Sequence, residues 1–284
     1  MHAFTFPTAV MLVAIGFGVG AFGTLIGAGG GFILTPILLL LYPHESAQTL
    51  TAISLAVVFF NAASGSVAYA RQGRIDYRSG TVFGLATLPG AVAGALVVGA
   101  VSRQVFDAIM GAVLALLAIW VLAGERWPLP RPTRDLERRE LHDRAGERYV
   151  YFVPLRRGAL YSLIVGFVSS FLGIGGGVIH VPLLVRTLGF PTHLATATSH
   201  FVLSIMAGAG TITHIAHGSF AHEQGVRRTL ALSAGVIGGA QLGAHVSLRV
   251  RGRMIEWLLA GALLALAARL LISAWPGTYA LSGS

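Results

Sequence analysis

The 284-residue sequence lacks two residue types entirely and contains few charges of either sign. The absence of cysteine excludes disulfides, thiol catalysis, iron–sulfur clusters and cysteine-type zinc sites. The absence of lysine makes all 20 basic residues arginine. Charged residues amount to 11% of the chain, whereas a soluble domain has about a quarter. Together with 55% hydrophobic residues, this composition predicts an integral membrane protein.

Other function classes are disfavoured by what is scarce. The net charge of +9 does not indicate nucleic-acid binding, because the arginines lie in short loops and one linker rather than on a patch interleaved with aromatic residues. The acidic residues outside the linker are dispersed and no Ser/His/Asp set is visible, so we expect no enzyme activity. Residues 1–20 have no basic segment before their apolar run, which predicts a permanent span rather than a cleaved signal peptide.

Apolar stretches fall into two sets on either side of a charged segment. Most are close to the roughly 20 residues that cross a bilayer as a helix. They are residues 8–42, 47–70, 79–100 and 105–124, and then 158–185, 194–217, 229–248 and 254–275. The arginines, acids and prolines between the two sets predict a polar, partly helical or disordered linker.

The two halves of the chain repeat each other. GAGGGFILTP at 27–36 matches GIGGGVIHVP at 173–182, and Thr51, Ala52 and Ser54 match Thr196, Ala197 and Ser199. Repeated halves in a membrane protein are typical of secondary transporters, with the binding site near mid-membrane. We therefore divide the chain into a first transmembrane repeat (1–124), a charged cytoplasmic linker (125–157) and a second transmembrane repeat (158–284).

The orientation of the halves depends on residues 8–42, which are too long for one span. If they enter the membrane and return, the halves are inverted; if they cross once, the halves are parallel. Inversion places most loop arginines on the linker side, whereas parallel halves divide them evenly. The arginines on the linker side are then Arg71, Arg74, Arg78, Arg186, Arg249, Arg251 and Arg253, and those opposite are Arg103, Arg227 and Arg228. This distribution favours inversion and leaves a re-entrant hairpin or two crossings as the alternatives for 8–42.

The duplicated triple glycine does not fit a nucleotide loop, because neither copy continues as GxGxxG with a following acid or carries a Walker lysine. Successive glycines disfavour helix, and unwound backbone inside a membrane is tolerated where it lines a cavity or is buried by protein. The apolar run after the first copy is too short to span, which predicts a half-helix whose N-terminus suits an anion. Close helix packing is the alternative, and we favour it for Gly16/Gly20, Gly90/Gly94 and Gly239/Gly243.

Polar side chains follow each glycine motif. Thr51, Ser54 and Asn61 share one helical face, and Thr196, Ser199 and His200 form a similar face. Neutral hydroxyl and amide donors suit an oxyanion, although Ser and Thr in membrane helices also bond to their own backbone or to a neighbour. His200 and His180 are the candidates for proton coupling, since histidine titrates near neutral pH. His214 and His217 have metal-ligand spacing, but without nearby carboxylates we favour interfacial histidines.

These features resemble the TauE/SafE family of membrane permeases. The shared features are the GxGGG motif with its proline, the Thr-Ala-x-Ser segment, the glycine-spaced third segment and the charged linker, over residues 8–275. The resemblance implies proton-coupled transport of small sulfur-containing or organic anions, such as sulfite or organosulfonates, across the bacterial inner membrane. The family motif falls on Gly27, Gly29, Gly30, Gly31 and Pro36, and on Gly173, Gly175, Gly176, Gly177 and Pro182. The repeat is not symmetric in chemistry, because Asn61 corresponds to Met206 and Leu55 to His200.

We thus expect an all-α polytopic membrane protein of two inverted-topology repeats, each with a discontinuous, re-entrant helical hairpin plus three transmembrane helices. We expect an anion carrier working by alternating access; an anion channel and a carrier of a non-sulfur carboxylate are the alternatives. Its partners are a small anion, protons and the lipid bilayer, without nucleic acid, cofactor or metal, and a homodimer remains open. The expected substrate-binding residues are Gly29, Gly30, Gly31, Thr51, Ser54, Asn61, Gly175, Gly176, Gly177, Thr196, Ser199 and His200.

Overall fold

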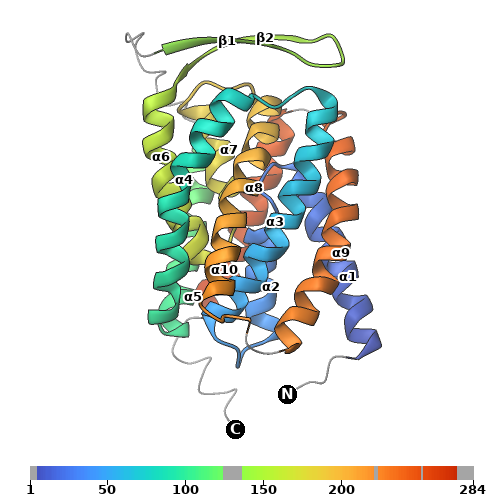
Figure 1. The fold of residues 1–284 in the computed structure, drawn as a ribbon, viewed down its shortest axis with the longest axis vertical. Helices are drawn as coiled ribbons and strands as arrows, with labels where there is room; N and C mark the ends of the chain where they lie inside the picture. Colours follow the sequence, from blue (N-terminus) through green and yellow to red (C-terminus); the bar gives the residue numbers. More distant parts are fainter. Residues whose placement is uncertain (1–4, 124–135, 221–222, 251, 274–284) are drawn as a thin grey trace.

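The computed structural model describes residues 5–123, 136–220, 223–250 and 252–273. These residues form a mostly helical bundle with one β-hairpin (Figure 1). In the first half the elements are α1 (Phe6–Leu25), α2 (Gly31–Leu41), α3 (Ala47–Gln72), α4 (Tyr77–Val97), the 3-10 turn η1 (Val98–Ala100) and α5 (Arg103–Leu122). Then follow β1 (Leu136–His142), β2 (Arg148–Pro154), α6 (Leu155–Leu172), α7 (Gly177–Arg186), α8 (Thr192–Ala216), α9 (Glu223–Val246) and α10 (Gly252–Ser273).

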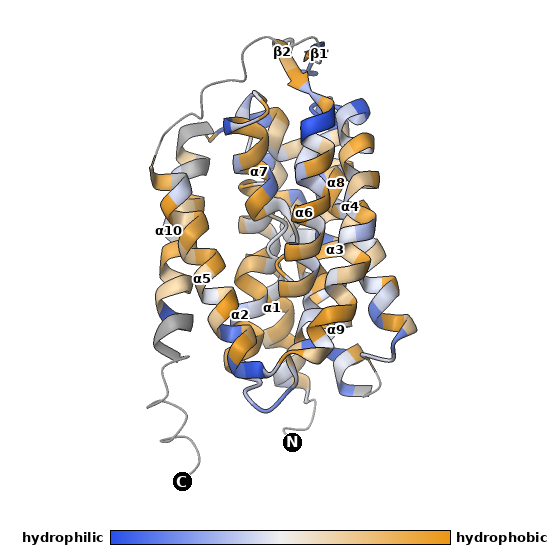
Figure 2. Cartoon of the chain, turned by 90° about the vertical axis from the view of Figure 1, so that its left-hand side faces the viewer, coloured by the Kyte–Doolittle hydropathy of each residue, from blue (hydrophilic) through white to orange (hydrophobic). Residues whose placement is uncertain are grey.

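The helices have the length and composition of a multi-pass membrane protein. Within the described residues, six helical segments are long and apolar enough to cross a bilayer, namely α1, α3, α4 with η1, α5, α6 and α9. Figure 2 shows hydrophobic residues along the helices and hydrophilic residues gathered at the two ends of the bundle. Leu85 on α4, Leu116 on α5 and Leu160 on α6 are more than half exposed, as expected for side chains that face lipid. The prediction of a helical polytopic membrane protein is confirmed.

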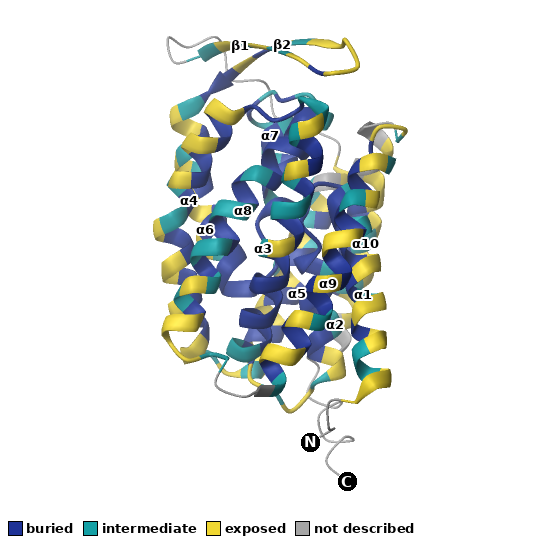
Figure 3. Ribbon diagram, turned by 45° about the vertical axis from the view of Figure 1, so that its right-hand side comes forward, coloured by how far each residue is buried: buried dark blue, intermediate teal, exposed yellow. Residues whose placement is uncertain are grey.

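Each half contributes helices that make equivalent contacts. α1 packs along α9, and its counterpart α6 packs along α4. α3 and α8 contact each other, with α9 against α3 and α4 against α8, while α5 pairs with α10. The short helices lie toward opposite ends of the bundle: α7 toward the hairpin and α2 toward the end away from it (Figure 1). Buried residues concentrate on the central helices α3, α7 and α8 (Figure 3).

Glycines permit the close packing of α1 on α9 and of α4 on α6. A Cβ at Gly16 would overlap the carbonyl oxygen of Leu232, and one at Gly90 would overlap that of Leu163. The backbones are therefore in contact, as small-xxx-small spacing predicts. The same holds for Gly20 against Val236, Gly94 against Phe167, Gly239 against Phe17 and Gly243 against Ala21. The packing interpretation of these glycine pairs is confirmed.

The linker departs from the sequence prediction. Residues 136–142 and 148–154 form an antiparallel hairpin, with Arg139 opposite Tyr151, so the prediction of helix or disorder is wrong for this part. The second strand alternates: Tyr151 and Val153 are buried, whereas Val150 and Phe152 are exposed. The composition of the linker did not reveal this pattern. Its arginines and acids indicated disorder, whereas in the structure some of them form ion pairs with the bundle. The remainder of the linker, 124–135, lies outside the described residues.

Asp76 joins the hairpin to the bundle at the start of α4. It caps α4 by accepting from the Ser79 amide (3.1 Å), and it also accepts from the Ser79 hydroxyl (2.6 Å). Arg139 of β1 lies 2.7 Å from its carboxylate, and the Tyr151 hydroxyl of β2 donates to it at 2.9 Å. Burial raises the pKa of Asp76, but the hydrogen bonds from Ser79 and Arg139 outweigh burial and hold the pKa below its ordinary value.

A second contact holds the hairpin turn against the end of α3. The Arg74 guanidinium lies 3.1 Å from the Asp143 carboxylate, and both side chains are buried. The backbone N–H of Arg144 donates to the Gln72 carbonyl (3.0 Å). The hairpin thus contacts the bundle through specific polar groups at its turn and midway along its strands.

Candidate functional site

The helix breaks lie where the triple glycines predicted them. α1 ends at Leu25 and α2 begins at Gly31; between them Gly27, Gly29 and Gly30 have φ values of 78°, 75° and 77°. α6 ends at Leu172 and α7 begins at Gly177, and Gly173 and Gly175 have φ values of 67° and 64°. Glycine adopts these left-handed conformations without the Cβ penalty of other residues. The glycines are therefore required by the backbone of both breaks.

The two breaks contact each other at the centre of the bundle. A Cβ at Gly31 would lie 2.7 Å from the backbone carbon and oxygen of Ile174. A Cβ at Gly177 would overlap the Gly27 carbonyl and lie 2.7 Å from the Ala28 Cα. Since Gly31 and Gly177 are the first residues of α2 and α7, both half-helices begin at this contact. Two helix N-termini, each with partial positive charge, are thus brought into one region.

Each break also packs against the long central helix of the opposite half. A Cβ at Gly173 would lie 3.0 Å from the Cα of Thr51 on α3. A Cβ at Gly27 would lie 2.8 Å from the Cα of Thr196 on α8. The predicted threonines therefore lie beside the predicted breaks, in equivalent places in the two halves.

The second break is held by hydroxyl groups from the first half. Ser54 donates to the Gly173 carbonyl at 2.7 Å, and the Thr35 hydroxyl lies 2.8 Å from the same oxygen. Thr35 and Ser54 are also 2.8 Å apart. The residue of α7 equivalent to Thr35 is Val181, which contacts Gly27 through a methyl group. The hydroxyl of Ser54 is thus engaged with backbone rather than directed into free space.

A polar cluster lies beside the first break, between α1, α3 and α8. Thr24 at the end of α1 donates to the Asn61 side-chain oxygen (3.1 Å), and its hydroxyl lies 3.2 Å from His200 Nε2. Tyr69 donates to the Thr24 carbonyl (2.7 Å), and its ring meets that of His200 edge to face. A Cβ at Gly65 would lie 2.5 Å from His200 Cδ2, so this glycine makes room for the imidazole.

Sequence reasoning found Asn61 and His200 in this cluster but missed Thr24 and Tyr69. A signal was present, since both are polar residues in apolar stretches and both have polar counterparts in the other repeat, Ser170 and His214. The structure brings the four together because α8 of the second half lies against α3 and the end of α1.

The equivalent region beside the second break has a different set of side chains. A Cβ at Gly210, the counterpart of Gly65, would lie 3.1 Å from both Leu55 Cδ1 and Ser170 Oγ. Met206 takes the place of Asn61, and its sulfur would lie 3.1 Å from a Cβ at Gly176. Asn61 and His200 thus lie on one side of the contacting breaks, whereas the other side has Met206 and Leu55 together with serine hydroxyls, as the unequal repeat sequences indicate.

Several buried polar atoms around the breaks have no hydrogen-bond partner among the described residues. They are Thr51 Oγ1, Asn61 Nδ2, Ser169 Oγ, Ser170 Oγ and Ser199 Oγ. Buried polar groups are normally paired, and leaving one unpaired costs about 1–3 kcal/mol. Orphaned donors gathered around two helix N-termini are the chemistry of a site that receives a hydrogen-bond acceptor.

The remaining predicted residues have other contacts. Thr196 donates to the Thr192 carbonyl (2.9 Å), which is the bond to its own helix backbone that the sequence analysis gave as the alternative to anion binding. His180 is fully buried, with Nε2 3.2 Å from Ser162 and its ring against Phe83. His180 therefore contacts α6 and α4, apart from the Thr24–His200 cluster.

Two discontinuous helices that meet inside a bundle of membrane-spanning helices define a multi-pass membrane protein of the transporter class. Comparison with known families specifies the class further. The chain belongs to the TauE/SafE sulfite exporter family, whose model matches residues 12–270. The resemblance seen in the sequence is confirmed, and members of this family are membrane transporters rather than enzymes.

Curated relatives support the same assignment. The probable membrane transporter protein YunE of Bacillus subtilis is 30% identical over 257 residues, which are 88% of this chain and 92% of the relative. The probable membrane transporter protein MJ0441 of Methanocaldococcus jannaschii is 26% identical over 210 residues, 72% of each chain. A probable membrane transporter protein of Haemophilus influenzae is 25% identical over 256 residues, 88% of this chain and 89% of the relative. No solved structure gives a significant match.

Proposed function

We propose that the protein is a secondary transporter that moves a small anion, such as sulfite or an organosulfonate, across the bacterial inner membrane. The observation that carries the proposal is the contact between the two glycine breaks, at which α2 and α7 both begin. Each helix N-terminus carries partial positive charge, so an anion at this point interacts favourably with both.

The proposed topology has two inverted repeats with α1–α2 and α6–α7 as re-entrant hairpins. Three observations support it: the matched helix contacts of the two halves, the placement of α2 and α7 toward opposite ends of the bundle, and the arginine distribution. The positive-inside rule then places the hairpin β1–β2 and the rest of the linker in the cytoplasm, with both termini outside.

In the proposed site, the anion accepts hydrogen bonds from the break backbones and from neutral side chains. The Asn61 amide, the Thr51 hydroxyl and the Ser199 hydroxyl offer buried polar atoms without a partner in the described residues. Ser54 positions the second break through the Gly173 carbonyl. The proposed set is Gly29, Gly30, Gly31, Thr51, Ser54, Asn61, Gly175, Gly176, Gly177, Thr196, Ser199 and His200.

Transport through this site requires movement of the halves, because every residue of the proposed set is buried. The breaks lie between the central helices α3 and α8, so rocking one half against the other would open them alternately to each side. His200 is the proposed proton carrier, since it reaches across from the second half to Thr24 of the first. Protonation would then change a contact between the halves. His180 stays a second candidate.

Purified protein in proteoliposomes tests this function. We expect uptake of labelled sulfite or of an organosulfonate such as taurine or sulfoacetate, with flux that falls when the pH gradient is collapsed. Lactate serves as the non-sulfur comparison. If lactate alone is transported, the substrate class is carboxylates rather than sulfur-containing anions. Currents that exceed carrier turnover and do not depend on the pH gradient would indicate a channel.

The site itself is tested by Asn61→Met, which introduces the residue found at the equivalent position 206. A hydrogen bond to a charged group contributes about 1.5–3 kcal/mol, so transport at low substrate should fall about tenfold to hundredfold. Thr81→Val, on an exposed face of α4, is the control and should leave transport unchanged. Wild-type kinetics for Asn61→Met in folded protein would contradict the site.

Proton coupling is tested by His200→Gln, which preserves hydrogen bonding without titrating near neutral pH. We expect transport to lose its dependence on external pH between about pH 5 and 8, the range in which histidine changes charge. An unaltered pH profile would exclude His200 as the proton carrier and leave anion binding at the breaks untouched.

A further inference from the structure

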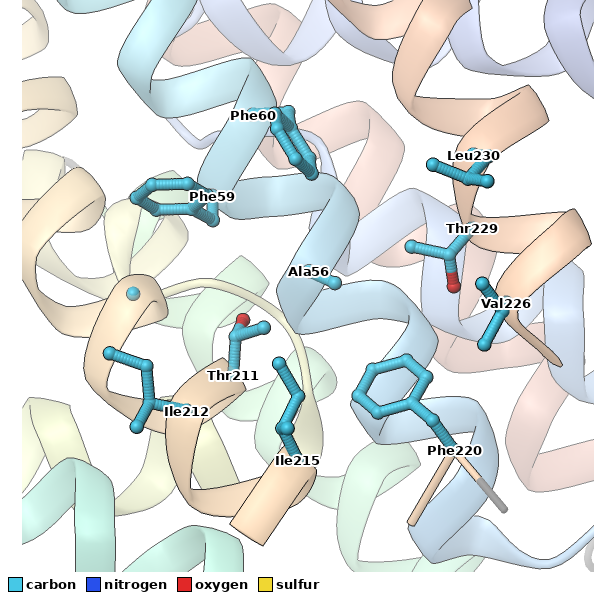
Figure 4. Close-up of a pocket in the computed structure, with 11 residues that line it drawn as sticks. Ala56, Phe59, Phe60, Thr211, Ile212, Ile215, Phe220, Val226, Thr229 and Leu230 are labelled. Carbon is cyan, nitrogen blue, oxygen red and sulfur yellow. The ribbon is translucent and has the colours of Figure 1, made fainter. Parts of the chain in front are cut away.

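An apolar groove lies on the outside of the bundle, away from the helix breaks. Its floor is α3, and its walls are α8 and α9, both of which contact α3 (Figure 4). The cavity has a volume of about 520 Å³. Phe59 and Phe60 extend from the floor toward the two walls, and Phe220 closes the end near the α8–α9 connection. Its two hydroxyl residues, Thr211 and Thr229, bond back to their own helices.

The position in the second half that is equivalent to the groove is filled by a side chain. The floor residue Ala56 corresponds to Phe201 in the second half. Phe201 occupies the equivalent space: a Cβ at Gly80 on α4 would lie 2.8 Å from its ring, and Tyr77 meets it edge to face. A Cβ at Gly225, the counterpart of Gly80 on α9, would meet nothing within 4 Å. A single small residue, Ala56, thus leaves open a space that phenylalanine fills in the other half.

The groove has the depth of one membrane leaflet. Ala56 and Phe60 lie about 13 and 20 Å from the start of α3, and Gly208 about 12 Å from the end of α8, at about 1.5 Å per residue. One leaflet contributes about 15 Å of hydrocarbon. Ile212, Ile215 and Leu230 on its walls are more than half exposed, so the groove opens sideways toward lipid.

Charge lies at the outer end of the groove. Arg227 follows the wall residue Val226 at the start of α9 and is exposed. His217 is exposed at the end of α8, just beyond the wall residue Ile215. An apolar channel about one leaflet deep with an arginine and a histidine side chain at its outer end matches an acyl chain that continues into a phosphate.

We propose that this groove binds one acyl chain of a phospholipid from the leaflet opposite the β-hairpin, with its phosphate beside Arg227 and His217. The chain separates α8 from α9 and packs on α3, the helix that also carries Asn61. The second half lacks the site, because Phe201 fills the equivalent position.

Photo-crosslinking in nanodiscs tests this site. The probe is a phospholipid with a diazirine midway along one acyl chain, and adducts are mapped by peptide mass spectrometry. In the wild-type protein we expect adducts to concentrate on residues 56–60 and 208–215. Ala56→Phe should lower them about tenfold, since displacing even two methylene groups removes that much affinity. Phe201→Ala should open the equivalent groove and produce new adducts on α8 and α4.

Two further variants keep the test independent of folding defects. Val226→Trp enlarges a side chain that lines the α9 wall of the groove and should also lower the adducts, whereas Leu85→Phe on the exposed face of α4 should not. A diazirine hydrocarbon without phosphate should label the groove less than the phospholipid. Adducts spread evenly over all lipid-facing helices, equal labelling by the phosphate-free probe, or a groove covered by a second copy of the chain would overturn the proposal.

Discussion

The hydroxyl pair that holds the second break gives a quantitative prediction. Thr35→Val removes one of the two hydroxyls at the Gly173 carbonyl, and Ser54→Ala removes the other. Valine has a precedent in the same surroundings, because Val181 occupies the equivalent place beside Gly27. The shape of the site is therefore retained in Thr35→Val, and the change in stability reports the hydrogen bond.

The expected changes in the free energy of unfolding follow because the two hydroxyls share the Gly173 carbonyl as one acceptor. Each single substitution leaves the Gly173 carbonyl with one donor, so each should lower the free energy of unfolding by about 0.5–1 kcal/mol. The double substitution leaves a fully buried carbonyl without a partner, which adds about 1–3 kcal/mol. We therefore expect the double variant to lose more than the sum of the singles, with a coupling energy of at least about 1 kcal/mol.

Equilibrium unfolding in mixed micelles, with detergent titration followed by circular dichroism, measures these differences. Thr81→Val is the matched control, because Thr81 is exposed on α4 and its loss should change stability by less than about 0.5 kcal/mol. Strict additivity of the two substitutions, or no effect of either, would refute the conclusion that the hydroxyls share one carbonyl.

Two further predictions concern packing and the hairpin. Gly90→Leu should lower the free energy of unfolding by about 1–3 kcal/mol or prevent folding, because the α6 backbone lies against Gly90. The control Gly18→Leu should be tolerated, because a Cβ at Gly18 would meet nothing within 4 Å. Thermal unfolding of the two variants compares them. Asp76→Asn should speed hydrogen exchange in residues 136–154, since Arg139 and Tyr151 lose their carboxylate. In the wild-type protein the contact of the hairpin with Asp76 should persist at neutral pH and be lost only as pH falls below about 4, because the pKa of Asp76 is lowered in the folded protein. Loss of the contact near pH 6 would contradict the role of Asp76.

Much of the helical architecture could be read from the sequence because it depends on local properties. Long apolar runs predicted the spanning helices, and the repeated glycines predicted the two breaks, since glycine adopts the left-handed backbone angles of Gly27 and Gly173 without a Cβ penalty. The hairpin was missed because its alternation is short and lies among charges. Those charges found partners, such as Asp76 for Arg139, that belong to distant parts of the chain.

The residues of the candidate site likewise divide into those that the sequence identifies and those that the structure reveals. Asn61 and His200 could be identified because polar residues in apolar helices carry a cost that function or pairing must offset. Thr24 and Tyr69 have polar counterparts in the other repeat, but their importance arises from contacts with His200 across 176 and 131 positions of sequence, which the structure alone reveals. The engagement of Ser54 with Gly173 is likewise a contact between halves.

The sequence by itself determined that this is a membrane protein with two repeated halves, where each half breaks its helix, and that the halves differ in polarity. Those properties follow from hydropathy and backbone preference, which each segment carries wherever it lies. Only the tertiary structure decided that the breaks touch, that α8 delivers His200 to Thr24, and that Ala56 leaves a groove where Phe201 fills one. These depend on which helices pack together, and packing is a property of the whole chain.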